Sequence, residues 1–178
     1  MPIIRAVAVG FGHTLVLANE GTVWTWGAMN CDWGSASVDV QITPRQIDGL
    51  EALVEIAAFQ EYRLALTRDG FVYGWGVVDP FASPNIVYVP APEPIPTLTD
   101  VVAIACGEPC NAAMLSDGSV WVWGRITANL VADHPGELMS HEPVQVTHPA
   151  VTASLAPLGA RIWLPNYLDP RVTAIFGP

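Results

Sequence analysis

Three histidines recur every seven residues in the last third of the sequence, with carboxylates around them. They are His134, His141 and His148, accompanied by Asp133, Glu137 and Glu142. Imidazole and carboxylate groups together could bind a divalent metal ion. A seven-residue spacing aligns side chains only on a helix, however, and prolines follow His134 and His148. We therefore interpret this stretch as a solvated loop that leads into a strand, and we predict neither a metal site nor a cofactor.

The remaining residue types that could react do not form a recognisable catalytic group. Cys106 and Cys110 lie four apart around a turn, where a disulfide is conceivable but not needed, and Cys31 makes the number of cysteines odd. Reduced thiols in a cytoplasmic setting are the simpler interpretation. The serines lack a nucleophile elbow and a histidine–acid pair, and we expect His13 to be a structural residue at the start of a buried strand. The sequence therefore predicts no catalytic residues and no enzyme.

Composition and charge narrow the classes of partner. The chain has 178 residues and a formal net charge of -10, and all seven basic residues are arginines. An acidic surface without lysine is a poor match to phosphate backbones, so nucleic acid is disfavoured as a ligand. We find no signal peptide and no stretch near the roughly 20 apolar residues that span a membrane. Since 51% of the residues are hydrophobic, we expect surface that is buried against other protein chains.

A repeat of about 49 residues organises the sequence and gives the elements that would position any site. "VWTWG", "VYGWG" and "VWVWG" end at Gly27, Gly76 and Gly124, and another glycine lies six residues before each of these. The structural positions of the repeat are Gly21, Trp24, Trp26, Gly27, Gly70, Trp75, Gly76, Gly118, Trp121, Trp123 and Gly124. Aligned repeats of this length are typical of solenoids and propellers.

The chemistry within each copy predicts strands. Glu-Gly or Asp-Gly between two apolar alternating runs is a hairpin signal, because glycine supplies a positive φ. Trp24 and Trp26 are two residues apart and therefore lie on one face of a strand. We expect these tryptophans to pack in a core, and we expect the glycine that closes the run to let backbone pass where a side chain would collide. Sixteen prolines and fifteen glycines add to the prediction of an all-β fold with four short strands per unit.

These residues resemble the regulator of chromosome condensation (RCC1) repeat family. The resemblance is carried by "AVAVGFGHTLVLANEGTVWTWG", "RLALTRDGFVYGWG" and "VVAIACGEPCNAAMLSDGSVWVWG", and "AMNCDWG" is similar to the family's turn after the first copy. It covers nearly the whole chain. It implies a β-propeller that is built by repetition and used mainly as a binding surface.

The number of copies departs from the family, whose rings typically have seven blades. We expect one domain over residues 1–178, with a part-blade at 3–20, blades at 21–69, 70–117 and 118–169, and a part-blade at 171–177. Unpaired blade edges seek partners. The part-blades could meet within one chain, they could meet across two chains, or the array could remain an open arc whose ends other proteins cover. Blade curvature and apolar composition favour the last two.

The loops after each "WG" are the least repetitive segments and are the expected sites of recognition. They contain Trp33, Phe81, Tyr88, Leu138 and Met139, which we predict to bind protein, although these loops could equally fold back over the blades. The first hypothesis is a non-enzymatic structural or interaction protein that self-associates or joins other subunits of an assembly, in the cytoplasm or in a particle such as a phage virion. The second is a regulatory binder, either a protein inhibitor or a propeller similar to an exchange factor.

Overall fold

The described part of the chain folds into β-strands and turns. The computed structural model describes residues 2–30, 39–78, 87–108, 110–126, 131 and 138–147. The strands are β1 (Ile4–Val9), β2 (His13–Ala18), β3 (Val23–Asn30), β4 (Asp39–Gln46), β5 (Leu53–Phe59), β6 (Tyr62–Thr67), β7 (Val72–Val77), β8 (Tyr88–Pro94), β9 (Val101–Ala105), β10 (Cys110–Leu115), β11 (Val120–Ile126) and β12 (Leu138–Gln145). They form three antiparallel sheets of four sequential strands. The predicted all-β fold of four-stranded units is confirmed.

A glycine turn closes the central hairpin of each sheet. Gly21, Gly70 and Gly118 have φ values of 87°, 81° and 84°, a region that glycine enters without a steric cost. In the second sheet the backbone N–H of Gly70 donates to the carbonyl oxygen of Thr67 at 3.1 Å. The predicted hairpins are therefore confirmed, and they fix the register of β2 with β3, of β6 with β7 and of β10 with β11.

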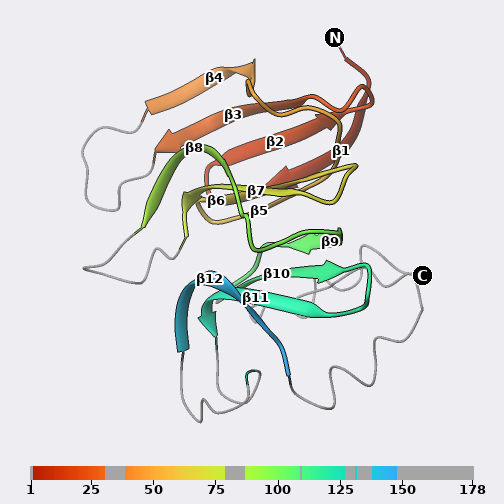
Figure 1. Ribbon diagram of the computed structural model, residues 1–178. Helices are drawn as coiled ribbons and strands as arrows, with labels where there is room; N and C mark the ends of the chain where they lie inside the picture. The colour runs from red at the N-terminus through yellow and green to blue at the C-terminus, as the bar shows by residue number, and fades with distance from the viewer. Residues whose placement is uncertain are drawn as a thin grey trace, which may run out of the picture.

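The three sheets lie face to face as successive blades (Figure 1). β1 and β2 contact β5, and β5 and β6 contact β9, so the first strand of each sheet lies beside the first strand of the next. β4, β8 and β12 form the outer edges. Across the described residues these extensive contacts join neighbouring sheets only, and the sheets form an open arc and not a closed ring.

The outer strands are rich in proline, which suits their position. β8 contains Pro90, Pro92 and Pro94, β4 contains Pro44 and β12 contains Pro143. Proline cannot donate a main-chain hydrogen bond, so it is tolerated in a strand that has one unpaired edge. The proline residues therefore mark the strand at which each sheet ends.

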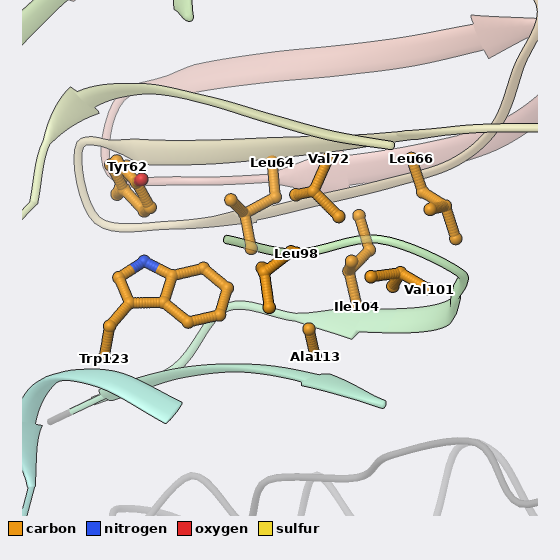
Figure 2. Packing of buried hydrophobic residues seen from close by; sticks show 9 residues of the cluster. All are labelled: Tyr62, Leu64, Leu66, Val72, Leu98, Val101, Ile104, Ala113 and Trp123. Carbon is orange, nitrogen blue, oxygen red and sulfur yellow. The ribbon is translucent and has the colours of Figure 1, made fainter. Parts of the chain in front are cut away.

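Two apolar clusters hold the blades together. The cluster between the first and second sheets contains Leu15, Leu17, Val23, Leu50, Leu53, Ile56, Ala65 and Trp75. The cluster between the second and third sheets contains Tyr62, Leu64, Leu66, Val72, Leu98, Val101, Ile104, Ala113 and Trp123 (Figure 2). In both clusters one sheet supplies leucines and a valine, and the next supplies a tryptophan with smaller side chains. The prediction that Trp75 and Trp123 pack in a core is confirmed, since they are 4% and 1% exposed.

The sheets begin and end at different residues from the units of the sequence repeat. The first sheet runs from residue 4 to 46, the second from 53 to 94 and the third from 101 to 145. Residues 3–20 supply β1 and β2, which pair with β3 and β4 from the 21–69 unit to complete a sheet within the chain. The predicted part-blade at 171–177 lies outside the described residues, as does the end of the 118–169 unit.

Candidate functional site

The residues that the sequence singled out for protein binding do not gather at one place. Trp33 and Phe81 lie outside the described residues. Tyr88 begins β8 and is 46% exposed, whereas Met139 is 40% exposed on β12, in a different sheet. Leu138 is half-buried and packs against the cluster of the third sheet. Protein binding by these residues stays a prediction.

The placement of Tyr88, Leu138 and Met139 in loops is wrong. Tyr88 pairs with Val77 of β7, and the other two pair with Ile126 and Arg125 of β11. Main-chain pairing thus continues beyond the "WG" of these two sheets, after a β-bulge. The outer strands therefore include residues that were expected in loops because they do not follow the repeat pattern.

An exposed apolar surface covers one side of the first sheet. Cross-strand pairing puts six residues on this side, and we name them the open face: Val7, Val9, Thr14, Val16, Trp24 and Trp26. Val7 and Val9 are 61% and 66% exposed, the two tryptophans are half-buried, and Val16 between them is only 7% exposed. None of the six carries a charge. Seven of the eleven large hydrophobic residues that are exposed in the described structure lie between Ile3 and Ile42, which marks the first sheet as the apolar end of the arc.

Positions equivalent to Val7 and Trp26 are buried in the other two sheets. The register aligns Val7 with Ile56 and Ile104, which are only 9% and 4% exposed. It likewise aligns the half-buried Trp26 with Trp75 and Trp123. The residue types are similar, so the difference in exposure arises because none of the described sheets lies against the open face. A contiguous apolar patch of this kind marks an interaction surface.

A groove of about 430 Å³ lies between the outer strands β4 and β8. Arg45 and Asp48 bring opposite charges to it, Trp75 and Arg63 line its inner part, and Tyr88 stands on the β8 side. Aromatic side chains and arginines are enriched where proteins recognise other proteins. This groove is therefore the place at which one of the predicted binding residues, Tyr88, lies beside charged and polar groups.

A smaller groove of about 200 Å³ occupies the equivalent place between β8 and β12. It is lined by Tyr62 and several prolines, and its ionisable residues are Glu93, His141 and Glu142. Of the three histidines spaced by seven residues, only His141 lies in the described structure. The two grooves thus differ in charge, since the first contains arginines and the second contains two glutamates.

A polar group is buried where the first two sheets meet. His13, Glu61 and Arg63 are 2%, 5% and 3% exposed, and Arg63 donates from Nη1 to the carbonyl oxygen of Glu61 at 3.3 Å. Burial, together with the positive charge of Arg63, lowers the pKa of His13 to about 4. His13 is consequently neutral at physiological pH and is held inside the protein, away from the grooves.

The low pKa of His13 predicts a loss of stability in mild acid. Between pH 6.5 and about 4, the unfolded chain binds a proton at His13 that the folded chain does not, so the free energy of unfolding should fall by about 1.4 kcal/mol per pH unit from this residue. No such dependence is expected above pH 7. Urea denaturation across this range should show that His13→Gln removes this slope. The same change at the exposed His141 should leave it intact, and a slope that survives in His13→Gln would contradict the assignment.

The described residues contain no cluster that could hold a metal ion, and the two cysteines among them are free. Groups of three or more histidine, cysteine or acidic side chains in metal-binding geometry are absent from this part of the chain. Cys106 and Cys110 form no disulfide, and burial raises the pKa of both thiols. No helix long and apolar enough to cross a membrane occurs among the described residues.

Comparison with known proteins identifies the repeat. Residues 4–32 match the family model described as the regulator of chromosome condensation (RCC1) repeat. Protein pim1 of Schizosaccharomyces pombe is 31% identical over 68% of this chain and 27% of its own length. The RCC1-like G exchanging factor-like protein of Mus musculus is also 31% identical, over 66% of this chain and 28% of its own. The chain thus spans less than a third of the length of these relatives.

A solved structure shows the same fold. Yeast RCC1 (Prp20), in a crystal structure with Kap60, superposes with a TM-score of 0.64 and 21% identity, over 82% of this chain and 36% of the yeast chain. The predicted RCC1-like blades are therefore confirmed, and the sequence match and the fold agree on the same repeat. The chain belongs to the proteins built from RCC1 repeats, and its three described sheets are blades of that β-propeller.

Proposed function

We propose that this chain is a non-enzymatic protein-interaction subunit that works within a larger assembly. The observation that carries the proposal is the open face, where Val7 is exposed although the equivalent isoleucines of the other two blades, Ile56 and Ile104, are buried. Leaving apolar surface of this kind in water is unfavourable, and a protein partner would remove it from solvent. The blades supply a rigid frame, and recognition takes place on their surfaces.

Two further observations support the proposal. A relative is named as a G exchanging factor-like protein, and the similar yeast structure was solved with a bound protein, Kap60. Free Cys106 and Cys110 suit a reducing compartment such as the cytoplasm. The relatives reported above are proteins of a yeast and a mouse, so a virus particle receives no support and is not part of the proposal.

A regulatory binder is the second candidate, and the groove between β4 and β8 favours it. Arg45, Asp48 and Tyr88 give this groove charged and aromatic groups that a single small partner could recognise. A regulatory binder of this kind would use the outer strands, whereas the assembly subunit uses the open face. The two candidates therefore predict different interaction surfaces.

The native mass of the chain tests the proposal. A tagged chain isolated under native conditions from cells that naturally express it should be found, by light scattering, well above its own mass of 19.1 kDa and should co-purify with other protein in a fixed ratio. Val9→Asp puts a charge on the open face and should release the chain as a monomer. Val102→Asp, the same change at a valine that is 50% exposed on β9, is the matched control and should leave the complex intact.

Two outcomes would speak against the assembly subunit. A compact monomer of 19.1 kDa with no co-purifying protein would contradict any stable interaction. A one-to-one complex with a small globular protein that is lost in Tyr88→Ala but kept in Val9→Asp would favour the regulatory binder.

A further inference from the structure

The repeat itself shows what covers the open face in an intact blade stack. In the second and third sheets, the side equivalent to the open face is covered by the preceding sheet. The covering residues are Leu15, Leu17 and Val23 over the second sheet, and Leu64, Leu66 and Val72 over the third. We name this arrangement the ridge: two leucines that are two residues apart on the second strand of a sheet, and a valine on its third strand.

Both ridges are used inside the chain. All six of these residues are at most 2% exposed, because each ridge is already packed between two blades. The third sheet has no ridge of this composition, since Ala112, Met114 and Val120 occupy the equivalent places, and Ala112 is already 1% exposed. The described part of the chain therefore offers no free ridge with which a second copy could cover the open face.

We propose that the open face docks a further blade of the same repeat type, other than the three described sheets, that presents a ridge of two leucines and a valine. This inference rests on the proposed function and names the partner that the open face would accept. The docked blade would repeat the contact that the first sheet makes with the second and that the second makes with the third.

The side chains of the open face fit this partner in size and charge. Val7 stands where the second sheet has Ile56, one carbon larger, and Val16 stands where it has Ala65, two carbons smaller. At these two positions the changes in side-chain size nearly cancel, which is the condition under which cores tolerate exchange of apolar residues. The face carries no charge although the chain has a net charge of -10, so an apolar ridge can approach without burying an unpaired ion.

A cyclic hairpin peptide can serve as the probe for this surface. A macrocycle of residues 62–76, closed between its ends, keeps the register in which Tyr62 faces Gly76 and presents Leu64, Leu66 and Val72 together. Its hairpin fold is checked first by cross-strand nuclear Overhauser effects. It is then titrated into the full chain labelled at the valine methyl groups. We expect saturable shifts of the Val7 and Val16 methyl signals.

Matched variants show whether the ridge and the face make the contact. Val7→Asp should weaken binding about tenfold or more, the loss expected when one buried valine side chain is removed from an interface. Val102→Asp should leave the affinity unchanged. In the macrocycle, replacing the two leucines by serine (Leu64→Ser and Leu66→Ser) should abolish the saturable shift.

Three results would overturn the inference: no saturable shift with a folded macrocycle, equal binding of the serine macrocycle, or Val7 shifts that appear when the chain alone is concentrated. The last would mean that a second copy occupies the face. Failure of the proposed function is a separate result, since a native chain isolated without any partner would contradict the assembly even if the macrocycle binds. A native complex together with a macrocycle that does not bind would reject only the blade-type partner.

Discussion

Replacing Trp123 by alanine should lower the free energy of unfolding by about 3–5 kcal/mol. The indole is 1% exposed and packs between the second and third sheets with Tyr62, Leu64 and Leu98 (Figure 2). The substitution removes apolar area from the cluster and leaves a cavity that the paired strands around it cannot close. Guanidinium denaturation followed by far-UV circular dichroism measures the change, because the backbone signal of the strands remains when the indole is removed.

The equivalent residue of the first sheet is the control for this prediction. Trp26 has the same place in the register but is half-buried on the open face. Trp26→Ala should therefore cost about 1–2 kcal/mol in the isolated chain, since less area is returned to water and no closed cavity is formed. Losses of equal size at Trp26 and Trp123 would mean that the open face is covered in the isolated chain, and would contradict the interpretation of that surface.

The hairpins and the core tryptophans could be predicted from the sequence because local chemistry determines them. Gly70 stands between two alternating apolar runs and has to supply a positive φ. Trp75 lies two residues after Tyr73, and both side chains therefore lie on one face of β7. The period of about 49 residues then repeats this unit, so the four-stranded architecture follows from one copy.

The division of the chain into sheets could not be predicted from the same period. A repeat gives the distance between equivalent residues but not the point at which one sheet ends and the next begins. The segments 47–52 and 95–100 make that break, and Ala52 and Asp100 lie there with positive φ values of 53° and 56°. Neither is a glycine, so these two positions carry no turn signal; Asp48-Gly49 lies in the first of these segments, but the segment 95–100 has no such pair, so the break does not repeat as a motif.

The exposure of the open-face residues could not be predicted from the sequence either, for a physical reason. Burial of Trp26, Trp75 and Trp123 depends on whether another blade lies against each of them, and all three are tryptophans followed by glycine. Exposure is thus a property of the stack and not of the single repeat. Comparing equivalent positions of the repeat identifies the exposed residues only when it is known which blade lies against which.

Replacing Gly76 by alanine is expected to lower the free energy of unfolding by about 3 kcal/mol or more. Gly76 has a φ of 102°, which costs a residue with a Cβ about 1–3 kcal/mol. An added Cβ would also collide with the carbonyl oxygen of Glu61. That carbonyl accepts the backbone N–H of Val77 at 3.1 Å, so β7 cannot move away without losing a hydrogen bond. The prediction that this glycine lets backbone pass is confirmed by the geometry.

Gly49 separates the two causes of that loss. Its φ is 78°, and a Cβ added there would meet nothing within 4 Å. Gly49→Ala should therefore cost only the conformational part, about 1 kcal/mol, and urea denaturation of both variants measures the difference. If Gly76→Ala costs no more than Gly49→Ala, the close approach of Glu61 does not constrain β7. A larger loss at Gly76 would show that the closing glycine of "VYGWG" is needed because another backbone segment passes close to it. Gly27 has a φ of 106° and lies against Gly12, so Gly27→Ala should then cause a similar loss.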